Sequence, residues 1–284
     1  MREEIDKALA GLALAAIAGA SLYVLVRQIR GKGASPERAR VWLAPAFGAL
    51  SYVFASRWAA LGYFPVANVR EAAVLFIWAL LGVYLFLDLT QGLRVLLPFL
   101  LPAAALAVPA LVAGPGAEIR RTEHLRDPSI VIHILAMVIA YAAYCASFGA
   151  AITYLAVDRG LKRKEARALE LDAPPLQKTE GLIYACVWVG SAALSAGILA
   201  GAFFAAERAK PQALALDPKV ILTGFTWCAY ALVLSLRHLG GMRGRKLAIL
   251  TAVMFIAVLA TSLGVEFVLP GRHATALPEV FLSR

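Results

Sequence analysis

The chain has 284 residues, of which 61% are hydrophobic and only 16% are charged, and its formal net charge at pH 7 is +10. A water-soluble domain of this size carries roughly a quarter charged residues and cannot hide so much apolar surface in one core. The composition therefore excludes soluble enzyme folds and indicates an integral membrane protein. Its apolar segments are unbroken runs of helix formers, whereas the strands of an outer-membrane barrel would alternate apolar and polar residues.

Eight apolar stretches are long enough to cross a bilayer as helices. A helix rises 1.5 Å per residue, so a hydrocarbon core of about 30 Å requires roughly twenty mostly apolar residues. No segment between these stretches is long enough to fold as a separate domain, so residues 1–284 are expected to form a single membrane domain. The sequence predicts an all-α polytopic membrane protein of eight transmembrane helices, near residues 8–26, 41–56, 69–87, 94–113, 130–156, 180–204, 220–237 and 247–268.

The basic residues are divided unevenly between the two sets of loops. Loops 27–40, 88–94, 157–180 and 237–246 hold sixteen Lys and Arg against seven Asp and Glu, and the rest of the chain holds twelve against eleven. Lys and Arg are retained on the cytoplasmic side, so these loops are expected inside and both termini outside. The basic runs then act beside anionic lipid rather than on nucleic acid. Loop 157–180 is expected to begin as an extension of the fifth helix up to Leu171.

The turn between the second and third predicted spans has the residues of a helix start. Pro65 would end one helix, Asn68 would cap the next, and Glu71 would lie near the positive end of that helix. This arrangement needs no ligand, although contact of these residues with a ligand is an equally open interpretation.

Motifs for several kinds of chemistry are absent from the sequence. The cysteines Cys145, Cys186 and Cys228 lie singly in three spans, so no CxxC pair is available for thiol exchange or zinc. There is also no phosphate-binding glycine loop and no HExxH sequence. Acidic residues are scarce near the middle of the spans, which weakens the case for an ion-coupled transporter. Hydrolytic or redox catalysis is not expected.

Two of the four histidines are predicted to lie at the same membrane depth. His133 begins the fifth span on the outer side, and His273 follows the eighth span on that side, while His124 lies in the outer loop before the fifth span and His238 at an inner helix end. Neutral imidazole is a common ligand of haem iron, and two helix ends could present it from opposite sides. Each histidine could instead be an interfacial residue that is hydrogen-bonded to water or headgroups.

Two further groups of residues are open to a structural or a functional interpretation. Small residues on the sixth span are expected to let a neighbouring helix approach closely; they are Ser191, Ala192, Ser195, Ala196, Gly197, Ala200 and Gly201. Aromatic residues in the outer half could line an apolar cofactor cavity, or they could serve as packing and interfacial residues; they are Tyr141, Tyr144, Tyr184, Trp188, Phe204 and Trp227.

Several short segments occur in an order that is typical of one family. They are Gly62–Glu71 with Pro65 and Asn68 between, His133–Tyr141, Leu161–Lys164, Asp217–Lys219, Thr226–Trp227, Arg243–Arg245 and Gly271–His273. In this order the sequence resembles the cytochrome c assembly family, the haem-handling membrane proteins that include the CcsA, CcmC and HemX-like proteins. The resemblance covers most of residues 50–275.

The resemblance implies a haem b site at the outer face. His133 and His273 match the two external histidines that ligate haem iron in the family, and loop 205–219 matches the loop that presents haem. Asp217 and Pro218 remain from the Asp-Pro-Lys end of that loop, and Trp227 follows as a further cofactor-binding candidate. Without haem, Asp217 would simply cap the next helix, with Pro218 at its first position.

The sequence departs from the family at two points. Loop 205–219 has no tryptophan, whereas the branch that delivers haem carries a Trp-rich segment there. No histidine lies inside a predicted span, because His238 is at a cytoplasmic end, so the internal ligands of members that carry haem across the membrane are missing. The HemX-like branch fits these departures better.

We therefore expect a haem-binding protein of cytochrome c maturation or haem homeostasis in the bacterial inner membrane. Its expected partners are haem, membrane lipid and a cytochrome c assembly protein or other membrane subunit, and not nucleic acid. One alternative is a haem-free membrane subunit or regulator that retains the family fold. The other is a small-molecule transporter.

Overall fold

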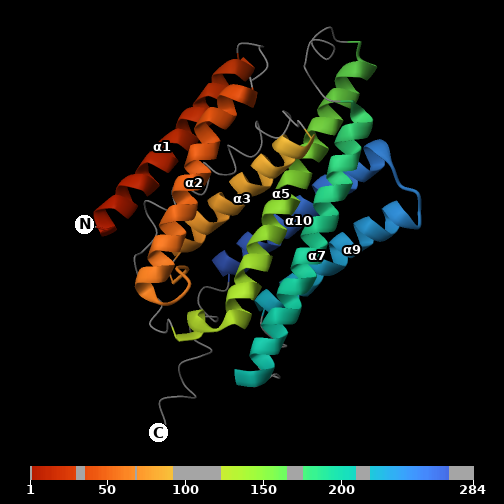
Figure 1. Cartoon of the computed structure of the whole chain (residues 1–284). Helices are drawn as coiled ribbons and strands as arrows, with labels where there is room; N and C mark the ends of the chain where they lie inside the picture. The colour runs from red at the N-terminus through yellow and green to blue at the C-terminus, as the bar shows by residue number, and fades with distance from the viewer. Residues whose placement is uncertain are drawn as a thin grey trace.

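All the regular secondary structure among the described residues is helical (Figure 1). The computed structural model describes residues 2–29, 36–67, 69–91, 123–164, 175–208 and 218–268. Long apolar runs favour helices because every backbone N–H and C=O is then paired within the segment, which a bilayer requires. The elements in these ranges are α1 (Arg2–Ile29), α2 (Pro36–Leu61), α3 (Val69–Gln91), η2 (Glu123–Arg126), α5 (Pro128–Lys162), α7 (Leu176–Arg208), α9 (Pro218–His238) and α10 (Gly244–Val268).

Seven of the eight predicted spans coincide with described helices. The remaining span, 94–113, lies outside the described residues. Within the described part of the chain, four helices are long and apolar enough to cross a membrane, and α1 contains a shorter apolar stretch, Ala8–Val24. The chain is thus a polytopic, all-helical membrane protein. The four crossing segments are Glu71–Leu89, Pro128–Lys162, Leu176–Glu207 and Pro218–His238.

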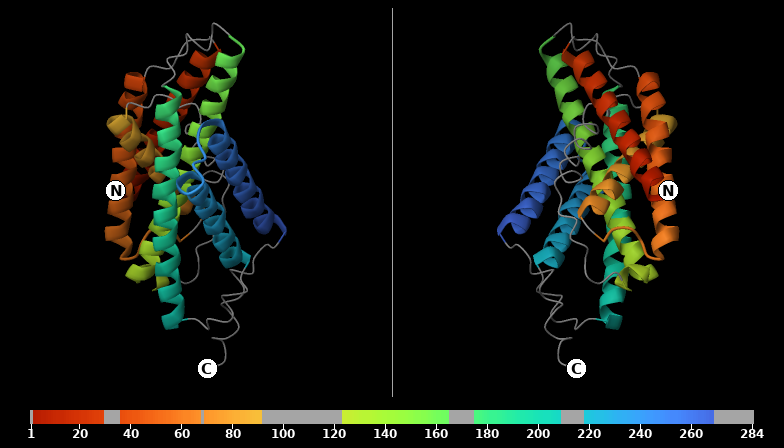
Figure 2. Two further views of the ribbon diagram at one scale, coloured as in Figure 1. Left: turned by 90° about the vertical axis from the view of Figure 1, so that its right-hand side faces the viewer. Right: turned by 90° about the vertical axis from the view of Figure 1, so that its left-hand side faces the viewer.

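The two longest helices, α5 and α7, make the most extensive contact among the described elements. Figure 2 shows α1 and α2 on one side of this pair and α9 and α10 on the other. Helix α3 packs on α2 and α5, while α9 and α10 pack on α7 and α5, respectively, and on each other. The α5/α7 pair therefore forms the centre on which the remaining helices are arranged.

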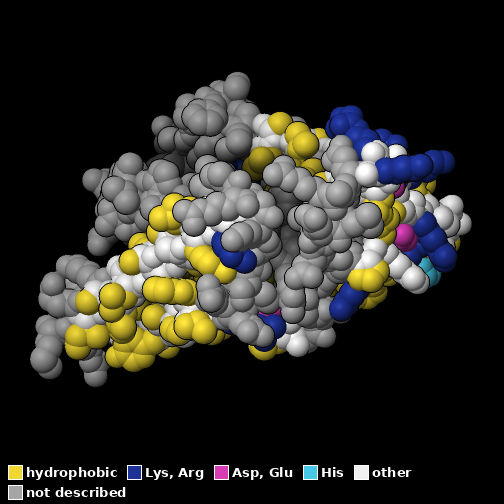
Figure 3. Space-filling view, turned by 90° about the horizontal axis from the view of Figure 1, so that it is seen from above, with side chains coloured by type: hydrophobic (Ala, Val, Ile, Leu, Met, Phe, Trp, Pro, Cys, Tyr) yellow, Lys and Arg dark blue, Asp and Glu magenta, His cyan; other side chains and the backbone are white. Residues whose placement is uncertain are grey.

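One end of the bundle is strongly basic. Here α5 and α9 end, α7 and α10 begin, and Lys162, Lys164, Arg245 and Lys246 are exposed; we call this the basic end (Figure 3). Glu180 joins the helices at this end, because it accepts a hydrogen bond from Gly244 N at 2.9 Å and pairs with the Arg237 guanidinium at 3.2 Å. The ends of four helices therefore meet on the side where the sequence predicts the basic loops.

The expected extension of the fifth helix to Leu171 is wrong. Helix α5 ends at Lys162, Arg163 is its C-terminal cap, and Lys164 has a positive φ of 53°. A residue in the left-handed region cannot continue a right-handed helix. At this end of the helix, Arg163 N donates a hydrogen bond to Arg159 O, and Lys164 N donates one to Leu161 O.

The opposite end of the bundle carries the turn between α2 and α3. The Glu71 carboxylate accepts a hydrogen bond from Ala67 N at 2.7 Å and pairs with the Arg57 guanidinium at 2.5 Å. Phe64 N donates to Leu125 O at 3.1 Å, which fastens this turn to η2. Glu71 thus has the helix-start role that its sequence position predicts, and Asn68 lies outside the described residues.

Replacing Glu71 should destabilise the fold. Glu71→Ala leaves the buried Ala67 N–H without its acceptor and Arg57 without its partner, a loss of about 1–3 kcal/mol. The midpoint of thermal unfolding in detergent should fall, whereas Glu207→Ala, a change at an exposed acid on α7, should leave it nearly unchanged. Equal midpoints for the two variants would contradict this role of Glu71.

Candidate functional site

His133 is fixed in the contact between α5 and α7. It lies near the start of α5, and its Nδ1 is 2.7 Å from the carbonyl oxygen of Gly197 on α7. A carbonyl oxygen can only accept a hydrogen bond, so Nδ1 must carry the proton. In the neutral ring, Nε2 then keeps a free lone pair, and among the described residues it has no hydrogen-bond partner. The side chain is thereby prepared to donate this lone pair to a ligand.

Glycine residues on α7 provide the space for this imidazole. A Cβ at Gly201 would lie 2.6 Å from His133 Nδ1, closer than real Cβ contacts allow. One turn earlier, a Cβ at Gly197 would lie 3.0 Å from the sulfur of Met137. The predicted small-residue face on this helix therefore does let a neighbour approach, and that neighbour is α5.

A second histidine contacts the same face of α7. His124, on η2, meets the ring of Phe204 edge to face, with ring centroids 5.8 Å apart. Positions 197, 201 and 204 are spaced by four and three residues, so they share one side of the helix. His124 is not among the site residues that the sequence predicts. The spacing from Gly197 to Phe204 could have indicated the shared face, but nothing in the sequence places a residue of η2 against it.

Trp227 lies apart from His133. Its indole N–H donates to the Ser195 hydroxyl at 2.8 Å, and Ser195 is two residues from Gly197, which is about 200° around the helix. Trp227 and Trp188 line a groove of about 240 Å³ between α7 and α9, and both are exposed there. The structure therefore does not bring Trp227 into contact with His133.

The other predicted site residues are described only in part. Pro218 is the first residue of α9, as expected for a proline at a helix start, and it is half-buried. Asp217 and His273 lie outside the described residues. Helix α10 ends at Val268, on the side of the bundle where α5 begins, five residues before His273.

Tyr144, one of the aromatic residues predicted in the outer half, lies in the core against Tyr230. The rings of Tyr144 and Tyr230 stack with centroids 3.6 Å apart and planes 5° from parallel, and both side chains are fully buried. A Cβ at Gly190 would lie 2.6 Å from the ring of Tyr144, so this glycine also admits an aromatic side chain from α5. Tyr144 therefore serves in packing α5 against α7 and α9.

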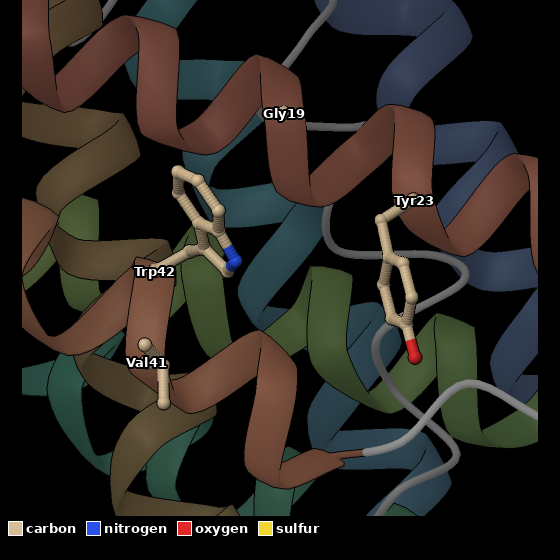
Figure 4. Close-up of a pocket in the computed structure, with 4 residues that line it drawn as sticks. All are labelled: Gly19, Tyr23, Val41 and Trp42. Atoms are coloured by element: carbon tan, nitrogen blue, oxygen red, sulfur yellow. The ribbon is translucent and has the colours of Figure 1, made fainter.

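A further cavity, between α1 and α2, is remote from the histidines. It has a volume of about 310 Å³ and is lined by Gly19, Tyr23, Val41 and Trp42 (Figure 4). Tyr23 lies near the end of α1 and Trp42 near the start of α2, so both rings are at the same end of this helix pair. This cavity has the character of a lipid-facing groove.

A methyl group at position 201 should displace the His133 ring. Gly201→Ala places a Cβ against Nδ1, so it should break the hydrogen bond to Gly197 and cost about 1–3 kcal/mol in the free energy of unfolding. The cost should be much smaller in a His133→Ala background, because the clashing ring is gone.

Gly181→Ala is the matched control for this cycle. It lies on the same helix, and a Cβ there has nothing within 4 Å. Unfolding midpoints of the four cycle variants and the control would measure the coupling. Equal costs of Gly201→Ala with and without His133 would refute the proposed contact.

Comparison with known proteins identifies relatives across most of the chain. Residues 66–273 match the profile of the family described as Cytochrome C assembly protein. The chain is similar to the cytochrome c biogenesis protein CcsA of Porphyra purpurea, with 26% identity over 80% of this chain and 83% of the relative. It is also similar to the CcsA proteins of Microcystis aeruginosa, with 25% identity over 79% and 83%, and of Synechococcus elongatus, with 26% identity over 79% and 83%. The matched range includes every predicted site residue.

Proposed function

The chain belongs to the cytochrome c assembly protein family and is a membrane protein of cytochrome c biogenesis, and we propose that it handles haem by ligating the iron through His133. Haem b is cargo in this proposal, and it supplies an iron with two axial positions for protein ligands. The protein binds, orients and transfers this cargo, so no hydrolytic or redox catalysis is assigned to it.

The state of the His133 ring carries the proposal. Histidines that ligate metals almost always donate their other ring N–H to a carboxylate or a backbone carbonyl, which fixes the ring and raises its basicity. His133 has this arrangement, with Nδ1–H on the Gly197 carbonyl and the Nε2 lone pair available. Gly201 leaves the space that this ring position needs. The residues present therefore fit an imidazole ligand of haem iron.

His273 is the proposed second ligand. It follows the last helix by five residues, and five residues of extended chain span at most about 18 Å. Because α10 ends on the side of the bundle where α5 begins, we propose that His273 approaches the haem from that side. Asp217 and Pro218, between α7 and α9, are proposed to belong to the loop that covers the cargo, and the contribution of Trp227 remains a prediction.

The proposed topology has eight spans with the basic end in the cytoplasm. Helices α3 and α5 run in the same direction, and in this proposal the apolar residues 94–113 supply the span between them. Exposed Lys and Arg side chains at the basic end favour the cytoplasmic side. Both termini and His133 then lie towards the outside of a bacterial inner membrane.

Within the family, we place the chain nearest the HemX-like branch. Loop 205–219 contains no tryptophan, so the flat indoles that could lie against a porphyrin are missing from it. His238, the last residue of α9, is exposed at the basic end and cannot serve as a ligand at mid-membrane. These features favour a protein that holds haem for a partner over one that carries it across the membrane.

The same two features support one alternative, a haem-free subunit that retains the family fold. The absorption spectrum of the purified protein separates the two. We expect hemin to give a histidine-ligated Soret band that sharpens on reduction with dithionite, and His133→Ala to abolish it. His238→Ala is the matched control and should leave the band unchanged.

Two results would overturn the proposal. One is a wild-type protein that shows no such band with hemin, particularly if it copurifies with a stoichiometric partner. The other is a band that is unaffected by His133→Ala.

A further inference from the structure

His124 and His133 face one stretch of a single helix. His133 fills the space over Gly201 and bonds to Gly197, and His124 contacts Phe204, three residues further along α7. Three residues correspond to a rise of about 4.5 Å. From these contacts we propose that His124 is a second haem-site histidine, able to ligate the iron opposite His133 in place of His273. This inference rests on the proposed function.

The backbone at His124 is held in place. Its carbonyl oxygen accepts a hydrogen bond from Asp127 N at 3.1 Å, and the Asp127 side chain in turn caps α5 by accepting from Ser129 N at 2.8 Å. The next residue, Leu125, is buried and accepts a hydrogen bond from Phe64 N. The turn that carries His124 is therefore built into both the start of α5 and the α2–α3 turn, and its position relative to His133 is fixed.

The ring of His124 is oriented by its contact with Phe204. Its plane lies 83° from that of Phe204, an edge-to-face arrangement. Among the described residues, neither ring nitrogen of His124 forms a hydrogen bond. A half-buried histidine with a purely structural role commonly satisfies a nitrogen within the protein. Here both remain available for a ligand.

The chemistry of haem gives this second histidine a role. The iron has two axial positions, and Nε2 of His133 can fill only one of them. His273 lies on the chain beyond the last described helix, whereas His124 lies on a turn fixed next to the His133 site. With His124 as an alternative partner, iron held by His133 keeps two imidazole ligands when His273 is not bound to it.

The test compares the coordination state of ferric haem in hemin-loaded variants of the full chain, by absorption and electron paramagnetic resonance spectroscopy. His273→Ala alone should remain six-coordinate and low-spin. Adding His124→Ala to it should convert the haem to a five-coordinate, high-spin form. His124→Phe with His273→Ala should behave in the same way, because phenylalanine keeps a ring against Phe204 but cannot ligate iron. Added imidazole should restore the low-spin signal in both double variants.

The possible failures are distinguishable. If His273→Ala alone becomes high-spin, or if the double variants have the spectrum of His273→Ala, His124 is not a ligand and this inference is overturned. Both results leave the wild-type band and its loss in His133→Ala intact, so the proposed function survives. A wild-type protein without histidine-ligated haem overturns both. If added imidazole does not restore the low-spin signal, the high-spin state of the double variants is due to damaged packing. This result would also refute the role of His124.

Discussion

The hydrogen bond from the His133 imidazole to the Gly197 carbonyl joins the two longest helices and determines the chemical state of the candidate ligand. It can form because α7 presents glycine at the points where α5 approaches with a large side chain, at 190 and 201. In a bilayer, helices gain little from burying apolar surface, so close packing over small residues and polar contacts between helices decide how they associate. The contact that assembles the centre of the bundle is thus also the contact that orients His133.

The opposite ends of the bundle are stabilised by different interactions. At the basic end, Glu180 connects the start of α10 with Arg237 near the end of α9. At the other end, Glu71 accepts a hydrogen bond from Ala67 N within the α2–α3 turn, and Leu125 fastens that turn to η2 beside the start of α5. These polar contacts lie near helix ends, where the cost of burying charge is smaller than at mid-membrane. They fix the frame in which His124 and His133 lie.

Much of this fold could be predicted from the sequence, because the bilayer thickness sets the number of apolar residues that a spanning helix needs. The predicted spans 130–156 and 180–204 lie within α5 and α7, which extend only a few residues further. The extension to Leu171 failed because the end of a helix outside the membrane depends on local backbone geometry, here the positive φ of Lys164.

The site was less accessible to sequence reasoning. His133 could be found from its place at a helix start and from the resemblance to the family, but its tautomer depends on a carbonyl from α7. His124 could not be found, because its contact with Phe204 arises from the way η2 folds back on the bundle. Trp227 could be predicted to be an aromatic residue at the right depth, yet the sequence does not reveal which face of α7 it contacts.

The central claim is that one nitrogen of His133 is held by the protein while the other binds iron. An experimental structure of the hemin-loaded protein in lipid nanodiscs, determined by cryo-electron microscopy, would test it most directly. The account predicts iron bonded to Nε2 of His133 with Nδ1 still on the Gly197 carbonyl. Haem bound elsewhere, or a His133 ring turned away from α7 with no iron on it, would contradict the account.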